Sequence, residues 1–318
     1  MLDKFKFNVS NYIYQSITND AFRFGFKENQ KINYNRFLNI LIKNYYEVSK
    51  DKLDIISKKF PDVEKGEIKE IISSSLLFNG IKESIMPKNF TIRPDKESAN
   101  IFLEIELKEL RNITISDYMR LILLEFCSLK IYEKEKIIFK QNYEIIRKSI
   151  ESKRKMYIVS RNSKFTFDCI NVVQSPDDEH NYLVGKSYYD NDISFVSSIK
   201  LSTIQSVISL DDEQTILEQD IDLINKNLEN GPQFIGAELV NAKVKFTPGG
   251  IKMYDKCYND RPICVAFDEK ENIMTFHNTI EHLFIYLKQF GRHALVLYPE
   301  ELRTKLKDFY IKANEAYK

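Results

Sequence analysis

The chain has 318 residues, of which 43% are hydrophobic and 29% charged, the composition of a folded protein long enough for two or three domains. Its 47 Lys and Arg residues nearly balance 46 Asp and Glu residues, so the net charge of +1 does not indicate a nucleic-acid or membrane partner. Only 9 glycines are present, which argues against glycine-rich phosphate loops and the dinucleotide and P-loop folds that need them. No apolar run approaches the roughly 20 residues of a bilayer span, and the first ten residues lack a signal core, so we expect a cytoplasmic protein.

The charges are unevenly distributed along the chain. Residues 1–170 carry 31 basic and 23 acidic side chains, a net charge of +8, whereas the remainder carries 16 and 23, a net charge of −7. A basic first half attached to an acidic second half predicts an anion-binding module at the N-terminal end. Two acidic runs in the second half, 177–179 and 211–213, are typical of solvated surface turns.

The N-terminal region predicts a half-buried strand followed by helices. Phe5, Phe7 and Val9 alternate with polar residues, and helices are predicted from about 11 to 26, from about 33 onward, and over 66–77. After Pro87 the order repeats, with a strand at 90–93, a helix over 96–110, a turn, and a helix capped by Thr114 or Ser116.

This repeated order of strand, helix, turn and helix resembles a ribbon-helix-helix DNA-binding module, in which two strands pair into a ribbon that enters the major groove. If the two copies pair within one chain, their outward polar residues form the exposed ribbon face, and helix starts hold phosphates. The alternative is a small helical bundle whose edge strands are only solubilised by Lys and Arg. The expected DNA-binding residues are Lys4, Lys6, Asn8, Thr91, Arg93, Thr114 and Ser116.

The segments FTFDCINVVQ, NYLVGKSYYD and SSIKLSTIQSV predict short strands of a small barrel. Their order resembles the WYL domain, an SH3- or Sm-like barrel, with 181–183 (Asn-Tyr-Leu) at the hallmark triplet and Lys200 at the basic position of the later motif. Ser197 and Thr203 stand where that pattern often has arginine, so an arginine fork is missing at two positions.

The WYL resemblance implies a pocket for an anion or nucleic-acid ligand, in which tyrosines stack and lysines meet phosphate. For Tyr182 the alternative is a core position, and for Lys186 and Lys200 it is an ordinary solvated strand position. The expected ligand-binding residues are Arg161, Lys164, Tyr182, Lys186, Tyr188, Ser198 and Lys200.

The C-terminal part predicts an acidic helix stopped at Gly231-Pro232, then the order β-α-β-β-α-β and a terminal helix. The stretch Phe290–Leu306 resembles the extension that commonly follows WYL domains. The expected fold is therefore multidomain α+β, with a ribbon-helix-helix-like N-terminal region, a WYL barrel and a ferredoxin-like C-terminal domain. The domain boundaries are predicted at 1–88 and 89–135 for the two ribbon-helix-helix-like units, 136–210 for the barrel with its leading helix, 211–233 for the acidic linker helix, and 234–318 for the C-terminal extension.

Catalytic chemistry finds little support in the sequence. The four cysteines form no CxxC pair, and His277 and His282 are five residues apart, so they do not share a helical face as zinc ligands at i and i+4 would. Residues 247–250 (Thr-Pro-Gly-Gly) lack the Lys and Ser or Thr of a phosphate loop and predict a plain helix start. We expect no enzyme activity, no cofactor and no metal site.

Together these patterns indicate a ligand-responsive, DNA-binding transcriptional regulator that forms a homodimer. Its WYL domain is expected to sense a nucleic-acid or nucleotide-like ligand, as the resemblance implies. The alternative is a CRISPR-associated accessory protein that binds single-stranded RNA and modulates an RNA-targeting effector, because WYL proteins with this layout also resemble such partners. The expected partners are therefore duplex DNA, single-stranded RNA or single-stranded DNA, and no membrane.

Overall fold

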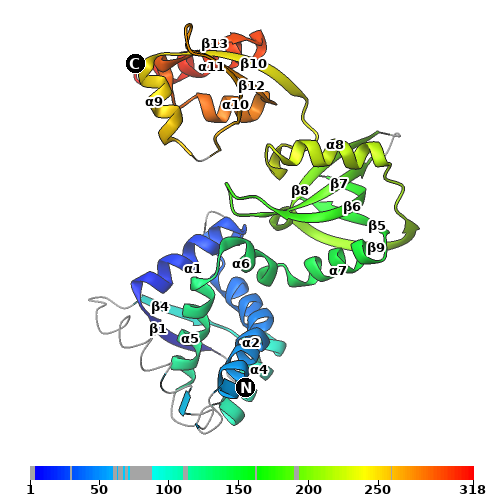
Figure 1. Cartoon of the computed structure of the whole chain (residues 1–318). Coiled ribbons are helices and arrows are strands. Elements are labelled where there is room, and N and C mark those ends of the chain that lie inside the picture. The colour runs from blue at the N-terminus through cyan, green and yellow to red at the C-terminus, as the bar shows by residue number, and fades with distance from the viewer. Residues whose placement is uncertain are drawn as a thin grey trace. The chain divides into compact units, whose positions relative to one another are not determined.

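The chain folds into two compact units, residues 1–143 and 144–318, of mixed α and β structure (Figure 1). The structure is a computed structural model. It describes residues 4–28, 31–59, 63, 67–68, 71, 88–109, 114–161, 163–189, 193–258 and 260–318. The helix predicted over 66–77 falls almost entirely outside the described residues.

The first unit combines a two-stranded ribbon with helices. Its elements in chain order are β1 (Phe5–Val9), α1 (Asn11–Arg23), β2 (Lys27–Glu28), β3 (Lys31–Ile32), α2 (Tyr34–Lys59), β4 (Lys88–Ile92), α4 (Lys96–Glu104), α5 (Ile115–Ser128) and α6 (Ile131–Ile138).

The helices of the first unit begin and end where local chemistry dictates. The hydroxyl of Ser10 accepts a hydrogen bond from the N–H of Ile13 and caps α1. This helix ends at Arg23, earlier than predicted, because Gly25 takes the left-handed conformation, with φ of 81°. After α4 the chain continues as a π-helical segment, Ile105–Glu109, rather than as α-helix to residue 110.

The two strands of the ribbon pair antiparallel, which confirms the predicted pairing of the segments around Phe5–Val9 and Phe90–Ile92. Phe5 lies opposite Ile92 and Phe7 opposite Phe90, and all four side chains are buried. Because alternate residues of a strand point to opposite faces, the intervening residues form the exposed face.

The first unit contains an internal repeat built around this ribbon. The caps of α1 and α4, Ser10 and Asp95, are 85 residues apart, and the same offset relates Phe5 to Phe90 and Phe7 to Ile92. For the second helix of each copy the offset is 81 residues. It relates six pairs of buried residues: Phe37 and Tyr118, Leu38 and Met119, Leu41 and Ile122, Ile42 and Leu123, Tyr45 and Phe126, and Tyr46 and Cys127.

Both copies contribute to one hydrophobic core. Helix α1 packs on α5, α4 packs on α2, and α2 packs on α5, which is the pattern expected of two units related by a pseudo-twofold axis. Each Å² of apolar surface that these helices bury contributes about 25 cal/mol to the stability of the fold. Because the buried side chains come from both copies, the two copies stabilise each other as one folding unit.

The second unit begins with α7 (Lys140–Glu151), which straddles the boundary, and continues with a five-stranded antiparallel sheet. The sheet order is β8-β7-β6-β5-β9. Its elements are β5 (Arg154–Ser160), β6 (Lys164–Gln174), β7 (Asn181–Tyr188), β8 (Ser194–Lys200) and β9 (Ile204–Glu213). A short 3₁₀ turn, Leu201–Thr203, separates β8 from β9, so the segment SSIKLSTIQSV contains two strands rather than one.

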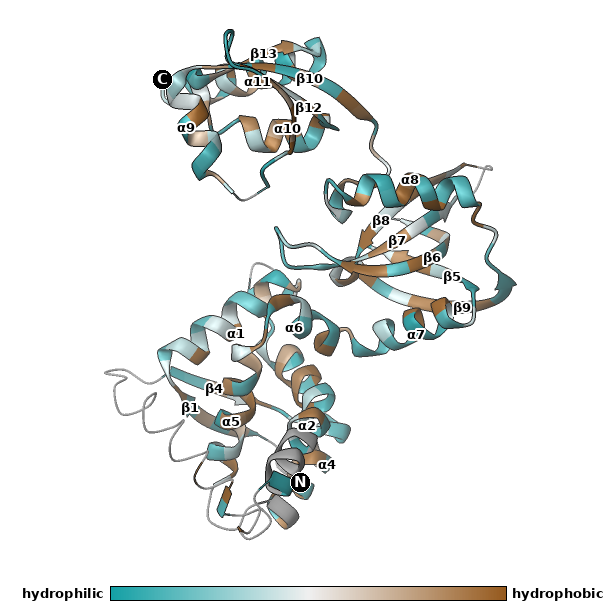
Figure 2. Cartoon of the chain, in the orientation of Figure 1, coloured by the Kyte–Doolittle hydropathy of each residue, from teal (hydrophilic) through white to brown (hydrophobic). Residues whose placement is uncertain are grey.

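A helix covers one face of this sheet. Helix α8 (Glu218–Leu228) packs on β7 and β8, where Ile224 meets Val184 and Val196 (Figure 1). Its hydropathy alternates between hydrophilic and hydrophobic residues along its length, as expected of a helix with one buried side (Figure 2).

The remaining elements follow the predicted order of β-α-β-β-α-β and a terminal helix. They are β10 (Leu239–Phe246), α9 (Pro248–Lys256), β11 (Cys264–Asp268), β12 (Ile273–Thr279), α10 (Ile280–Leu287), β13 (Ala294–Tyr298) and α11 (Glu300–Glu315).

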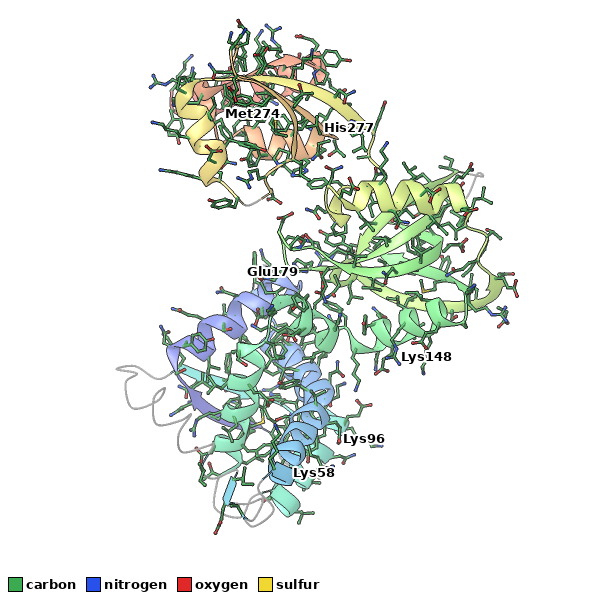
Figure 3. All side chains as sticks on the ribbon, viewed as in Figure 1. Lys58, Lys96, Lys148, Glu179, Met274 and His277 are labelled. Atoms are coloured by element: carbon green, nitrogen blue, oxygen red, sulfur yellow. The ribbon has the colours of Figure 1, made fainter. Side chains whose placement is uncertain are left out.

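The four strands form an antiparallel sheet in the order β11-β12-β10-β13. Met274 and His277, labelled in Figure 3, lie on opposite faces of β12, with Met274 in the core. The predicted helix start at 247–250 is confirmed, since the Thr247 hydroxyl accepts from the N–H of Gly250 and Pro248 is the first helical residue.

The prediction of solvated turns is confirmed in part for the first acidic run and is wrong for the second. Residues 211–213 form the end of β9, because Glu213 lies opposite Arg154 of β5. Residues 177–179 lie at a turn, but Asp178 is only half-exposed and is bonded to other side chains. A run of like charges therefore does not reveal which of its members is paired.

Candidate nucleic-acid interface

The exposed face of the ribbon is polar throughout and carries no acidic residue. Lys6 of β1 lies opposite Thr91 of β4, and Asn8 lies opposite Asn89. Lys4 and Arg93 lie beside the Phe5–Ile92 pair, which extends the face by one position at that end. The structure thus brings together five predicted residues, Lys4, Lys6, Asn8, Thr91 and Arg93, all of them exposed.

Asn89 belongs to the same face, although the sequence did not mark it. Its exposed side chain lies opposite Asn8 in the register of the two strands. The predicted strand segment, NFTIRP, contains Asn89, but its alternation was followed only over 90–93, whereas β4 begins at Lys88. An alternation that started one residue earlier would have included Asn89 on the polar face.

The start of α2 contacts one end of the ribbon. The Oδ1 of Asn35 accepts a hydrogen bond from the N–H of Arg93 at 2.7 Å. Asn33 caps this helix by accepting from the N–H of Arg36 at 3.0 Å, and the Arg36 side chain is exposed.

The start of α5 contacts the other end of the ribbon. The Nε of Arg120 donates to the carbonyl oxygen of Asn8 at 2.7 Å, and its Nη1 is paired with Asp117. Thr114 and Asp117 form a capping box at this helix start, so the predicted residue Thr114 is engaged with the Asp117 carboxylate. Ser116 is half-buried in the same turn.

In the second unit, five predicted ligand residues share one face of the five-stranded sheet. Tyr182 lies opposite Lys200, and Lys186 and Tyr188 follow at alternate positions of β7. Ser198 lies opposite Val184 on this face. This is the face on which α8 packs, so the chain itself covers part of the predicted pocket.

The two lysines of this face are each paired with a carboxylate of the same chain. The Nζ of Lys200 lies 2.7 Å from Oδ2 of Asp178, and the Nζ of Lys186 lies 2.8 Å from Oδ2 of Asp220 on α8. The hydroxyl of Tyr182 donates to the same oxygen of Asp178 at 2.6 Å. A phosphate that binds Lys186 or Lys200 would therefore compete with a carboxylate of the same chain.

These contacts shift the ionisation of nearby groups. Burial alone would raise the pKa of Asp178, but hydrogen bonds from Lys200, Tyr182 and the N–H of His180, with the charge of Lys200, hold this pKa below its usual range. Burial raises the pKa of Tyr188 to about 12, and the buried carboxylate of Asp168, which accepts from its hydroxyl at 2.8 Å, acts in the same direction.

The remaining two predicted ligand residues lie apart from this face. Arg161 and Lys164 are exposed at the hairpin between β5 and β6, where Ser160 and Ser163 form the turn. Lys155 of β5 was not predicted, yet its Nζ lies 4.6 Å from the centre of the Tyr188 ring.

A pocket of about 260 Å³ lies within the second unit, between the turn at 175–180, the end of α8 and the segment that precedes β11. Asp260 and Asp177 line it, and burial followed by the charge of Asp177 raises the pKa of Asp260. His282 stacks on Phe234 with ring centres 4.2 Å apart, and burial lowers its pKa. The pocket is therefore lined by a like-charged carboxyl pair beside an imidazole.

Within the described ranges, no group of three or more His, Cys, Asp or Glu side chains is placed to hold a metal ion. No helix in the described part of the chain is both long and apolar enough to cross a bilayer.

Comparisons with known proteins identify a fold. No protein-family model and no curated protein matches the chain. A crystal structure of a CRISPR Cas-related protein superposes with a TM-score of 0.78 at 17% identity, over 99% of this chain and 94% of that one. Proteasome accessory factor B/C of Arthrobacter aurescens aligns with a TM-score of 0.27 at 14% identity, over 69% of this chain and 35% of that one, too low to support an argument. The chain therefore shares its fold, over nearly its full length, with the CRISPR Cas-related protein.

Proposed function

We propose that this protein is a DNA-binding regulator whose first unit reads duplex DNA through the exposed face of the β1–β4 ribbon. The observation that carries this proposal is the ribbon itself: six polar side chains, three of them basic and none acidic, on a two-stranded sheet whose other face is the core. A two-stranded ribbon fits the major groove, which is about 12 Å wide. The starts of α2 and α5 contact the two ends of the ribbon, so their backbone N–H groups would face the flanking phosphates of a bound duplex.

The layout of the chain supports assigning its parts to the resembled domains. The internal repeat, with its paired strands and packed second helices, corresponds to two ribbon-helix-helix units in one chain. The five-stranded sheet corresponds to the WYL barrel, and the strand order β11-β12-β10-β13 to a ferredoxin-like domain. We assign the second unit to binding a nucleic-acid or nucleotide-like ligand and to homodimer formation, and we assign no enzyme activity to the chain.

A ligand of the second unit regulates DNA binding only if its affinity differs between the DNA-competent and DNA-incompetent arrangements. Electrostatics support placing duplex binding in the first unit, which carries 24 basic and 20 acidic side chains, a net charge of +4. Seven basic residues of the basic half lie between 144 and 170, in the second unit, so the split at 170 overstates the charge of the first unit. The relevant quantity is the local charge of the ribbon face.

The test compares two triple variants of the full chain. Lys4→Ala, Lys6→Ala and Arg93→Ala remove the ribbon cations, and Arg292→Ala, Lys307→Ala and Lys312→Ala remove three exposed cations of the second unit as a matched control. Duplex affinity is measured by fluorescence anisotropy between 50 and 300 mM KCl. Each bound cation that displaces counterions from the DNA contributes about 0.9 to the magnitude of the slope of log K against log salt concentration. We therefore expect the magnitude of this slope to fall by about 2 to 3 for the ribbon variant. An unchanged slope contradicts the proposal.

A second candidate is an accessory protein that binds single-stranded RNA and modulates an RNA-targeting CRISPR effector. The full-length likeness to a CRISPR Cas-related protein favours it. In this reading RNA binds the second unit, through Arg161, Lys164 and the tyrosines of the sheet. Tighter binding of single-stranded RNA than of duplex DNA at equal salt, unaffected by the ribbon triple variant, supports this candidate over the first.

A further inference from the structure

The ribbon has two chemically different ends, and the internal repeat shows which residues at the two ends are equivalent. With the 85-residue offset and the observed register, the pseudo-twofold axis passes through the Lys6–Thr91 pair, because these two residues are equivalent and lie opposite each other. Asn8 is then the equivalent of Arg93, and Lys4 the equivalent of Asn89. One end therefore presents Lys4 and Arg93, and the other presents Asn8 and Asn89.

A ribbon made by two identical chains has identical ends and reads a palindrome, because its symmetry imposes the same contacts on both half-sites. In this protein both strands belong to one chain, and the outward residues have diverged while the buried ones kept their pairing. The core thus retains the twofold pattern that the exposed face has lost.

The helix starts reinforce the same polarity. Asn35 and the exposed Arg36 of α2 lie at the end with Lys4 and Arg93, since Asn35 bonds the N–H of Arg93. At the other end, α5 places Asp117 in its first turn, and Arg120 both pairs with that carboxylate and bonds the carbonyl of Asn8. One end therefore presents Lys4 and Arg93 on the strands and Arg36 on α2, beside the cap Asp95, whose carboxylate is paired with Lys43. The outward face of the other end presents amide side chains and the Asp117 carboxylate paired with Arg120, with Lys88 exposed at the neighbouring strand position.

We propose that the ribbon reads a short non-palindromic element of duplex DNA, with guanine preferred at the Lys4–Arg93 end and adenine at the Asn8–Asn89 end. Arg and Lys pair with the O6 and N7 acceptors of guanine in the major groove, and Asn pairs with the N6 and N7 groups of adenine. Lys4 and Asn8 are four residues apart, about 13 Å along a strand, which spans about four base pairs. This inference rests on the proposed duplex binding by the ribbon.

The test selects bound sequences from a duplex library with a random centre, using the full chain. We expect a consensus in which each bound element is asymmetric, even when two chains occupy an inverted repeat. In the double variant Lys4→Asn and Arg93→Asn both ends carry amides, so the guanine preference is lost and adenine is selected at both ends. In Asn8→Ala with Asn89→Ala the adenine preference falls by roughly tenfold to hundredfold, while the guanine preference remains. All four positions are exposed, and circular dichroism checks that the variants fold.

The outcomes separate this inference from the function on which it rests. A palindromic element in the wild-type selection, or a consensus unchanged by Lys4→Asn with Arg93→Asn, contradicts the proposed recognition of a non-palindromic element. Either result is still compatible with duplex binding by the ribbon. Failure to enrich any duplex sequence, or preference for single-stranded RNA in a parallel selection, overturns the proposed function and this inference together.

Discussion

Asn39 and Arg120 occupy equivalent positions in the two copies of the N-terminal repeat and perform the same task. Each is the sixth residue after the cap of its helix, Asn33 or Thr114. Asn39 Nδ2 donates to the carbonyl of Arg93 at 3.1 Å, and Arg120 Nε donates to the carbonyl of Asn8 at 2.7 Å, equivalent residues at the two strand ends. The second helix of each copy thus bonds an equivalent backbone carbonyl, one at each end of the ribbon.

This relationship predicts that Asn39→Ala destabilises the first unit. Asn39 is buried, its Nδ2 also donates to the Asn35 carbonyl, and its Oδ1 accepts from the N–H of Asp95. Its removal takes a hydrogen-bond partner from three partly buried backbone groups, so we expect a loss of about 1–3 kcal/mol in the free energy of unfolding. Urea unfolding followed by circular dichroism measures it. Asn35→Ala is the matched control, because Asn35 is exposed and, among the described residues, its side chain bonds the Arg93 N–H alone. A loss equal to that of Asn39→Ala contradicts the argument.

Asp178→Asn is expected to weaken the second unit at neutral pH but not in acid. The folded-state pKa of Asp178 is lowered, so its ionised form stabilises the fold. That contribution is fully present above the unfolded pKa of about 3.8 and is lost as the pH falls through the lower folded value. We therefore expect thermal unfolding to show a lower Tm for Asp178→Asn than for wild type at pH 7, and the difference in Tm to narrow as the pH falls below about 3.8. A difference in Tm that stays constant across this pH range shows that the ionised Lys200–Asp178–Tyr182 network is not the source of the stabilisation.

Asp260→Asn is expected to act in the opposite direction. Burial and the charge of Asp177 raise the pKa of Asp260, so the folded protein binds a proton more readily than the unfolded chain. Stability then falls as the pH rises from about 3.8 through the folded pKa, and the neutral amide avoids this loss. Asn also tolerates the φ of 53° at this position.

The expected gain is below about 1 kcal/mol at pH 7 and absent at pH 3. Urea unfolding at both pH values measures it. Asp260→Ala serves as the contrast, because it also removes the charge but strains the left-handed backbone. A loss of stability on Asp260→Asn at pH 7 contradicts the like-charge argument.

Local patterns were sufficient to predict much of this fold. The alternation around Phe5 and Phe7 predicted the first strand, and the β-α-β-β-α-β order of the C-terminal part matches the observed elements. Long-range pairing was less accessible to sequence reasoning. Neither the pairing of Asn89 with Asn8 across the ribbon nor the partners of Lys186 and Lys200 is a property of neighbouring residues. Asp220 lies 34 residues from Lys186 and reaches it only because α8 folds back onto the sheet.

The pairing of Lys186 with Asp220 separates the two candidate functions. Both side chains are 15% exposed, so Asp220 neutralises a lysine that an RNA phosphate would otherwise meet. If RNA binds this face, Asp220→Asn frees the Lys186 charge, and affinity for a single-stranded RNA probe rises by about three- to tenfold. The double variant Lys186→Ala with Asp220→Asn is the control and loses this gain, because it lacks the cation that the first variant exposes. Equal RNA affinity in wild type and Asp220→Asn, measured by fluorescence anisotropy, excludes this face of the sheet as the RNA site and leaves the hairpin with Arg161 and Lys164, and the ribbon, as the surfaces to test.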